Sequence, residues 1–266
     1  MLRVNRLKKK LGVRERATGC WIFLAGGDST ELLSHCGFDA FIVDHEHIGA
    51  DFRTLVEQMR AAQASDTAVL LRVPSHDPVY IKRALDAGVD GVVVPTMETA
   101  DQARAVVAAT RYRPQGGNRG VGYPESRAAK WSLAELEYPR EYLDQLLVAT
   151  IIETKKGVQN LPAILEIEGI DMIISGPGDL AADLVSDFSR LTEYGSYDNP
   201  ELHAMVRQIE ERTKAAGRWL GGVARRPEAA PGFFARGYDF VTITADSWLL
   251  ADGAKRALAE ATRSRA

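Results

Sequence analysis

The sequence predicts one closed (β/α)8 barrel, a TIM barrel, as a single domain spanning residues 1–266. Short apolar runs rich in β-branched residues alternate with longer segments whose apolar residues recur with helical periodicity. This alternation is typical of parallel strands joined by covering helices, and eight repeats close the sheet into a barrel. The chain has 266 residues, 45% of them hydrophobic, and no Pro/Gly/Ser-rich linker divides it, so one large core is expected.

The predicted strands follow the apolar runs in chain order. They are CWIFLA (20–25), AFIVD (40–44), AVLLRV (68–73), GVVVP (91–95), VATIIE (148–153), DMIISG (171–176), RWLGGV (218–223) and DFVTIT (239–244). Capping signals mark the helices between them. We expect capping boxes at Asp28 with Glu31 and at Thr99 with Gln102, an N-cap at Asp77 before Pro78, and a C-terminal glycine at Gly88.

The longest irregular stretch, RYRPQGGNRGVGYPESRAAKW at about 111–131, separates the fourth helix from the fifth strand. Loops of this length are usually functional lids or interface elements. We treat the stretch as part of the single domain.

Charge and composition argue against several classes of partner. The net charge is −3 and the pI about 6.0, and the basic segment RLKKK near the start fits a solvated first helix rather than a nucleic-acid site. The two cysteines, Cys20 and Cys36, form no CxxC or zinc pattern, and no signal peptide or membrane-length apolar run is present. We expect a soluble cytoplasmic protein with neither nucleic-acid nor membrane partners.

Ionisable residues gather where the predicted strands end, which is where barrels of this class place their chemistry. Burying a charge costs several kcal/mol unless a partner is present, so convergence of these groups implies mutual pairing, a bound ion, or both. The residues are Asp44, Glu46 and His47 after the second strand, Arg72 on the third, Glu153 on the fifth, and Gly176-Pro177-Gly178-Asp179 after the sixth.

Two interpretations of Glu153 and Asp179 remain open from the residues alone. Both carboxylates end adjacent strands and could hold a hard divalent cation such as magnesium, manganese or cobalt. Alternatively, Glu153 pairs with Arg72 while Asp179 caps the next helix. The two glycines of the 176–179 turn would let backbone amides approach an anion such as a carboxylate, although such glycines are most often simple turn residues.

Acid–base chemistry has candidates beside these carboxylates. Arg72 could clamp a carboxylate or stabilise an oxyanion, or form only a structural ion pair. A lone histidine is more often structural, but acids surround His47 and His45, and an imidazole oriented by Asp44 or Asp86 is a typical general base. We therefore favour a catalytic histidine.

The ordered motifs resemble the HpcH/HpaI family of class II pyruvate aldolases, from about Thr18 to Leu250. No single fragment is specific, whereas the series in this order is. The motifs are VDHEH, LLRVPSHDP, RALDAG, VVVPTMETADQAR, RYRPQGGNRGVG, IIETKKGVQNLPAIL, GIDMIISGPGDLAADL and GYDFVTITADSWLL.

The resemblance implies a metal-dependent aldolase that reversibly cleaves a 4-hydroxy-2-oxo acid into pyruvate, or a close 2-oxo acid such as hydroxypyruvate, and an aldehyde. Glu153 and Asp179 match the metal ligands, with Mg, Mn or Co as the ion and no organic cofactor. The 176–179 turn matches the segment whose amides, at Gly178 and Asp179, hold the substrate carboxylate. Arg72 matches the arginine that contacts the keto oxygen and steadies the enolate.

Catalytic and quaternary roles also follow from the resemblance. His47 matches the catalytic histidine, with Asp44 beside it. Asp86 matches an acid that completes a His–Asp pair from a neighbouring subunit. Family members are typically hexamers, trimers of dimers, and the segment 246–262 would form the C-terminal helix that packs on a partner barrel.

Two departures from the family pattern concern the surroundings of the site. His45 stands where relatives often have a small residue, so we expect a second imidazole to crowd the base. Arg225 and Arg226 follow the seventh strand and could lie near the tail of the aldehyde. We hypothesise that these positions affect the choice of acceptor, while a solvated loop is the plainer alternative.

Other functions remain as alternatives. A metal-free aldolase would need a Schiff-base lysine, and Lys155 and Lys156 are the near candidates, although both lie beyond the predicted strand. The same enolate chemistry could also serve an oxaloacetate decarboxylase or an acyl-CoA lyase. A barrel that binds a 2-oxo acid and metal without turnover is the non-enzymatic alternative.

Overall fold

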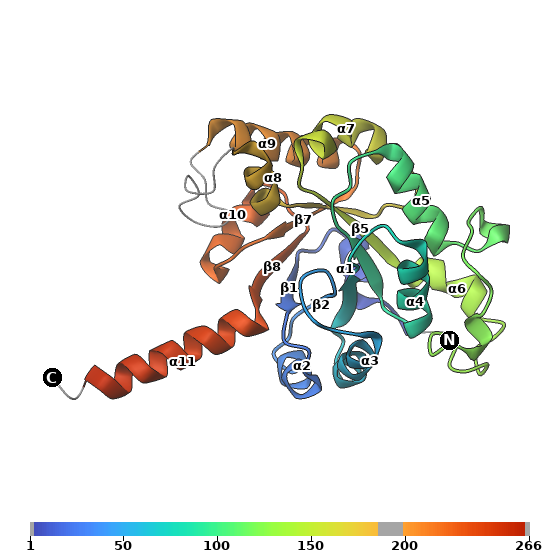
Figure 1. Ribbon diagram of the computed structural model, residues 1–266, viewed down its shortest axis with the longest axis horizontal. Coiled ribbons are helices and arrows are strands. Elements are labelled where there is room, and N and C mark those ends of the chain that lie inside the picture. The colour runs from blue at the N-terminus through green and yellow to red at the C-terminus, as the bar shows by residue number, and fades with distance from the viewer. Residues whose placement is uncertain (1–2, 186–198, 264–266) are drawn as a thin grey trace.

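The computed structural model describes residues 3–185 and 199–263 and contains a closed barrel of eight parallel strands in the order β1 to β8 (Figure 1). Every strand pairs with its sequence neighbour, and β1 also pairs with β8 to close the sheet. The predicted barrel is confirmed. The strands are β1 Ala17–Ile22, β2 Ala40–Asp44, β3 Ala68–Arg72, β4 Gly91–Val94, β5 Leu147–Ile152, β6 Met172–Ser175, β7 Trp219–Val223 and β8 Phe240–Ala245.

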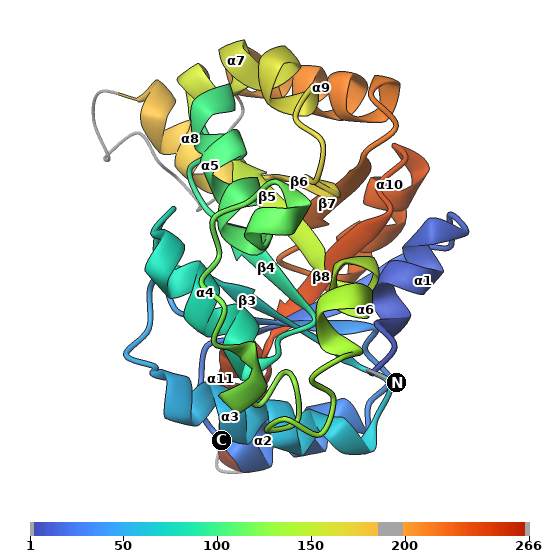
Figure 2. The same ribbon diagram turned by 90° about the vertical axis from the view of Figure 1, so that its right-hand side faces the viewer.

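Helices surround the barrel, as the rotated view shows (Figure 2). The α-helices are α1 Arg6–Gly12, α2 Gly27–Ser34, α3 Phe52–Ala61, α4 Pro78–Ala87, α5 Ala100–Thr110, α6 Tyr138–Gln145, α7 Lys155–Leu165, α8 Pro177–Leu184, α9 Pro200–Ala215, α10 Ala230–Ala235 and α11 Asp246–Arg263. Short 3-10 turns are η1 Ala62–Ala64, η2 Arg113–Gln115, η3 Tyr123–Glu125 and η5 Pro227–Ala229. None of the helices in the described ranges combines the length and apolarity needed to cross a membrane.

The first strand shows the largest displacement from its predicted position, whereas the fifth and eighth strands are displaced by one residue. Strand β1 ends at Ile22 and begins at Ala17, three residues before the predicted start. Its first residues are small because the ring of Phe240 fills the space beside them: a Cβ on Gly19 would lie 2.5 Å from Phe240 Cζ. The apolar signal of this strand is therefore weak where pairing begins and strong where the chain already leaves the barrel.

Most of the predicted helix boundaries are confirmed. The capping box at Thr99, the N-cap at Asp77 and the left-handed Gly88 (φ 86°) all lie where they were expected. The box at Asp28 is wrong, because α2 begins at Gly27 after an N-cap at Gly26, which leaves Asp28 inside the first helical turn.

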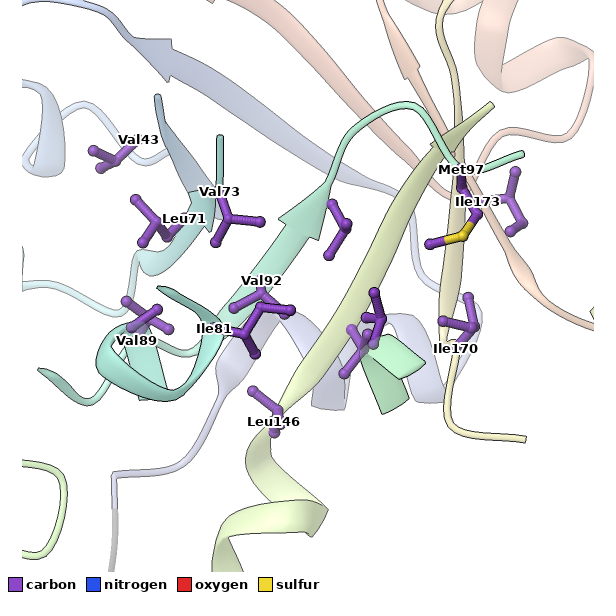
Figure 3. Close-up of a cluster of buried hydrophobic side chains, with 14 of the residues drawn as sticks. Val43, Leu71, Val73, Ile81, Val89, Val92, Met97, Leu146, Ile170 and Ile173 are labelled. Carbon is purple, nitrogen blue, oxygen red and sulfur yellow. The ribbon is translucent and has the colours of Figure 1, made fainter. Parts of the chain in front are cut away.

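Two apolar layers hold the barrel together. One fills its interior, and the other lies between the strands and the surrounding helices. Figure 3 shows part of the outer layer, where Leu71 and Val92 on strands lie beside Ile81 of α4. Strands buried on both faces read as continuous apolar runs, so polar residues become possible only where a strand ends. Because all eight strands are parallel, their ends, and the ionisable residues there, meet at one mouth of the barrel.

A buried arginine holds the long segment between α5 and β5. Arg119 Nη2 donates hydrogen bonds to Asp86 Oδ1 at 2.7 Å and to the Tyr138 hydroxyl at 2.9 Å. The rings of Tyr112, Tyr138 and Tyr142 lie 4.7–5.6 Å from its guanidinium carbon. The segment is thereby tied to the end of α4.

Helix α11 extends away from the barrel (Figure 1). Its main contacts with other elements are to β1 and β8, and Leu249, Leu250 and Leu258 are exposed along it. Packing of this helix on a neighbouring subunit stays a prediction.

Candidate active site

A cavity of about 630 Å³ lies at the mouth where the strands end. Its wall includes four of the residues predicted from the sequence, His47, Arg72, Glu153 and Asp179, together with the turn formed by residues 176–178. The strands that carry these groups, β2, β3, β5 and β6, end at the same mouth of the closed barrel, which brings together groups that are more than 130 positions apart in the chain.

Arg72 is buried at the cavity wall and held by two carboxylates. Asp44 and Arg72 are register partners on β2 and β3, and Arg72 Nε donates to Asp44 Oδ1 at 2.8 Å. Arg72 Nη1 lies 3.1 Å from Glu46 Oε2, and the guanidinium carbon lies 4.5 Å from the centre of the Trp21 ring. Because two nitrogens are engaged, the remaining nitrogen Nη2 can donate to an oxygen in the cavity.

The loop after β2 is organised by Asp44. Its carboxylate accepts hydrogen bonds from the backbone N–H of Glu46 at 2.9 Å and of His47 at 3.3 Å, in addition to that from Arg72. Asp44 therefore positions the backbone of His47, whereas the partner of the His47 imidazole is Glu46. His47 Nε2 lies 3.4 Å from Glu46 Oε2.

Glu46 is the site residue whose role the sequence did not assign. Burial raises the pKa of its carboxyl, Arg72 and His47 lower it, and Asp44 and Asp179 raise it. The available signal was its position two residues after Asp44, since alternate residues continuing from a strand share a face.

Glu153 has one oxygen fixed and the other free. Glu153 Oε1 accepts hydrogen bonds from the Thr96 backbone N–H at 2.6 Å and from the Thr96 hydroxyl at 3.1 Å, while Oε2 has no hydrogen-bond partner among the described residues. Burial raises the pKa of Glu153, with further increases from Asp179 and Glu46. The alternative pairing of Glu153 with Arg72 is wrong, because Arg72 binds other carboxylates.

The 176–179 turn packs against the side chain of Glu153. A Cβ on Gly176 would lie 2.7 Å from Glu153 Cβ and 2.8 Å from a side-chain carbon of Ile151, so glycine is required there. The N-cap of α8 is Gly176, without a side-chain cap, and Asp179 lies exposed in the first turn. Asp179 is therefore not the helix cap that the alternative interpretation required, and the first-turn N–H groups have no intrahelical acceptors.

The donor set suits a hard cation held in part by water and substrate. Carboxylate oxygens are the preferred ligands of Mg²⁺, and the repulsion among Glu46, Glu153 and Asp179 is what a cation relieves. Within residues 3–185 and 199–263, no group of three or more His, Cys, Asp or Glu side chains is arranged to hold a metal ion. The assignment of Glu153 and Asp179 as a pair of metal ligands therefore stays a prediction.

Asp86 does not join this site within the chain. It lies near the end of α4, away from the strand ends, and its carboxylate pairs with Arg119. A His–Asp pair with His47 would need a second copy of the chain, so this role stays a prediction.

His45 faces away from the cavity. Its Nδ1 lies 2.8 Å from the Tyr80 hydroxyl, and its ring packs edge-on against Phe52 and Tyr80. The expected crowding of His47 by this ring is wrong, because the two side chains leave the loop toward different layers. Burial lowers the pKa of His45, while Asp44 and Asp51 oppose that shift.

We expect His45 to make the protein less stable as the pH falls below about 6.5, the ordinary pKa of histidine. Because the folded-state pKa is lowered, the unfolded chain binds more protons in this window, and stability decreases with falling pH. When the pH is lowered from 7.5 to 5.5, the melting temperature of His45→Gln should therefore fall less than that of the wild type. His203→Gln, at an exposed position of α9, is the control and should follow the wild type. Equal losses in His45→Gln and wild type would contradict this assignment.

Another part of the cavity wall is aromatic and cationic. Trp21 stacks on Phe23 with ring centres 5.6 Å apart, and Trp248 of α11 lies 6.2 Å from Phe23. Arg225 and Arg226 also line this wall, with the Arg225 guanidinium carbon 5.4 Å from the centre of the Trp248 ring. The sequence located the arginines but missed Phe23 and Trp248, which come from opposite ends of the chain.

Comparisons with known proteins identify the family of the chain. A model of the family described as HpcH/HpaI aldolase/citrate lyase matches residues 17–253. The chain is 34% identical over 251 residues to 4-hydroxy-2-oxo-heptane-1,7-dioate aldolase of Shigella sonnei (strain Ss046), covering 94% of this chain and 92% of that protein.

Solved structures show the same relationship. An HpcH/HpaI aldolase/citrate lyase family protein from Burkholderia cenocepacia J2315 superimposes with a TM-score of 0.89 at 31% identity, covering 97% of this chain and 99% of that one. Citrate synthase SbnG shares the fold, with a TM-score of 0.84 and 23% identity, covering 98% of each chain. The chain therefore belongs to the HpcH/HpaI aldolase/citrate lyase family of enzymes.

Proposed function

We propose that the protein is a divalent-metal-dependent aldolase that reversibly cleaves a 4-hydroxy-2-oxo acid into pyruvate, or a close 2-oxo acid such as hydroxypyruvate, and an aldehyde. The observation that carries the proposal is the convergence of Arg72, His47, Glu153 and Asp179 on one cavity at the strand ends. The relatives named 4-hydroxy-2-oxo-heptane-1,7-dioate aldolase support this reaction class.

Breaking the C3–C4 bond of such a substrate leaves an enolate, whose negative charge grows on the former keto oxygen. A bound Mg²⁺, Mn²⁺ or Co²⁺ at Glu153 and Asp179 would supply Lewis-acid charge for the carboxylate and keto oxygens of a 2-oxo acid. Arg72 donates to the keto oxygen from Nη2, and it is held in place before the reaction by Asp44 and Glu46. The backbone N–H groups that open α8 receive the substrate carboxylate.

His47 is the proton carrier in this proposal. It is exposed to the cavity and can take the proton from the C4 hydroxyl, directly or through a water, and return one in the aldol direction. Glu46 Oε2 lies 3.4 Å from Nε2, where it can orient the ring. The Asp86 of a neighbouring copy would complete the pair in a homo-oligomer, which we propose as the active assembly.

The Schiff-base alternative has little geometric support. Lys156 Nζ lies 2.9 Å from Glu98, and Lys155 Nζ lies 3.8 Å from Glu201, so each is paired with an acid. Neither lysine lines the cavity that holds Arg72.

Pyruvate release from a racemic 4-hydroxy-2-oxo acid, coupled to lactate dehydrogenase, tests the proposal. We expect turnover that EDTA abolishes and that Mg²⁺, Mn²⁺ or Co²⁺ restores. Full activity after exhaustive chelation, or substrate-dependent trapping by borohydride, would overturn it in favour of a lysine. Oxaloacetate and an acyl-CoA are tested as competing substrates. If either is turned over faster than the 4-hydroxy-2-oxo acid, a decarboxylase or an acyl-CoA lyase replaces the aldolase assignment.

We expect Arg225 and Arg226 to favour aldehydes with an anionic tail. Both side chains line the same cavity as Arg72, Glu153 and Asp179, so an aldehyde tail that reaches them would meet two positive charges. The double variant Arg225→Gln/Arg226→Gln should lower kcat/KM for succinic semialdehyde about tenfold relative to a neutral aldehyde of similar length, with pyruvate as donor. Arg207→Gln on α9, exposed and outside the cavity, is the matched control. An unchanged ranking of the two aldehydes would refute the role.

A further inference from the structure

A second cavity, of about 400 Å³, lies at the opposite end of the barrel from the candidate active site. It is bounded by residues that precede β4 and β5 and by the last turns of α3 and α4. Three arginines from separate parts of the chain line it: Arg3 from the N-terminal segment, Arg60 from the end of α3, and Arg127 from the segment between α5 and β5. Folding thus assembles a cationic cavity from residues that are distant in sequence.

The positive charge in this cavity is only partly balanced by the protein. Among the described residues, Asp90 is the one acidic residue of its wall, and the charges of Arg3 and Arg127 act on its carboxylate, which also accepts a hydrogen bond from the Val69 backbone N–H at 2.8 Å. Within the described residues, none of the three arginines lies within ion-pair distance of a carboxylate. An arginine cluster in which positive charges outnumber carboxylates is a usual arrangement for binding phosphate or carboxylate groups of a ligand.

Backbone carbonyls aim two of the guanidinium groups without neutralising them. Arg3 Nη2 donates to the carbonyl oxygens of Ser65 at 3.2 Å and Thr67 at 2.9 Å, and Arg127 Nη1 donates to the Ala87 carbonyl at 2.9 Å. The pKa of Arg127 is lowered, chiefly by burial and then by the charges of Arg60 and Arg3. A bound anion would remove this repulsion and would use donors that are already oriented.

The wall beside the arginines includes a strained segment. Lys130, Trp131 and Ser132 have φ values of 53°, 50° and 71°, in the left-handed region that non-glycine residues rarely adopt. Such conformations cost about 1–3 kcal/mol each and tend to persist at ligand sites. Here they hold the Trp131 ring at the cavity while leaving 60% of the residue exposed.

We propose that this cavity binds a small multivalent oxyanion, with the charged groups of the ligand placed among Arg3, Arg60 and Arg127. The shared chemistry is a cluster of phosphate or carboxylate oxygens, and the volume is that of a small metabolite. The site is separate from the aldolase cavity, so it does not depend on the proposed function.

Titration with inorganic phosphate, pyrophosphate and citrate, at ionic strength matched with chloride, tests the site by calorimetry and melting temperature. We expect saturable binding of at least one probe and at least tenfold weaker binding to Arg60→Gln/Arg127→Gln. The preferred probe distinguishes a phosphate ligand from a polycarboxylate. Arg53→Gln, exposed on α3 and outside the cavity, is the matched control and should bind as the wild type does.

The active site could also bind these anions through Arg72, so Arg72→Met is tested in parallel. Retained binding in Arg72→Met with loss in Arg60→Gln/Arg127→Gln supports the second cavity. Loss in Arg72→Met alone, or an absence of saturable binding in the wild type, overturns the proposal. The single variant Arg60→Gln, at an exposed position, repeats the comparison if the double variant does not fold.

Discussion

Glu153→Gln is expected to lower the rate of pyruvate release about 1000-fold while the fold stays intact. Glutamine has the same shape, and its carbonyl oxygen can still accept the hydrogen bonds from Thr96. It lacks the negative charge that a divalent cation requires from Oε2. The loss therefore falls on metal binding and catalysis rather than on packing.

The stability of this variant should equal or exceed that of the wild type. Burial and the neighbouring acids Asp179 and Glu46 raise the pKa of Glu153, which means that its ionised form destabilises the folded chain without a cation. The neutral amide removes that cost. Melting temperature in EDTA is the measurement, and calorimetric titration with Mn²⁺ should show weaker binding.

Glu98→Gln is the matched control for this experiment. Glu98 follows the adjacent strand β4, is paired with Lys156 and does not line the cavity. Its replacement should leave pyruvate release within about twofold of the wild type, since a surface ion pair contributes little. Retention of wild-type turnover by Glu153→Gln would remove the central residue of the proposed metal site.

The sequence was sufficient for those parts of the fold and site that follow from periodicity. Buried strands must be apolar throughout, so their ends are visible as the first charged residues, and this located Arg72 and Glu153. The direction in which each side chain points was harder to predict from the sequence. Beyond the end of a strand the alternation of faces depends on the loop, and only the structure showed that His45 turns to Tyr80 while Glu46 turns to Arg72.

Other features depend on contacts that the sequence does not reveal. Phe23 and Trp248 line one wall because Asp246 accepts hydrogen bonds from the backbone N–H groups of Phe23 and Leu24, both at 2.9 Å, across the closure of β1 on β8. Nothing in the local pattern of either segment indicates this meeting. Asp86 was proposed from the residues as one of two acids that could orient the imidazole, and in a single chain its partner is Arg119.

Arg72→Met is expected to lower both stability and activity. The loss of stability should depend on pH, whereas the loss of activity should remain when the pH is lowered. Methionine fills similar space but leaves the buried carboxylate of Asp44 and the half-buried carboxylate of Glu46 without their cation, which should cost about 3 kcal/mol in the free energy of unfolding at pH 7.5. Removing the guanidinium from the keto oxygen should also lower kcat/KM by about 100-fold to 1000-fold.

The stability loss of Arg72→Met should shrink as the pH falls to 5.5. Burial already raises the pKa of Glu46, and Arg72 opposes that rise, so the pKa increases further when the arginine is removed. A carboxyl whose folded-state pKa is raised binds more protons in the folded state, and stability then increases as the pH falls through that pKa. Urea unfolding at pH 7.5 and 5.5 measures the effect.

The double variant Arg72→Met/Glu46→Gln distinguishes a stability loss caused by an unpaired charge from one caused by altered packing. If the unpaired carboxylate causes the loss, the amide should restore part of the stability at pH 7.5 and remove most of the pH dependence. Activity should not return with stability in either variant, because no positive side chain then faces the oxygen that gains charge. Recovery of turnover at pH 5.5 alongside the fold would show that Arg72 holds the loop after β2 and takes no direct part in the chemistry.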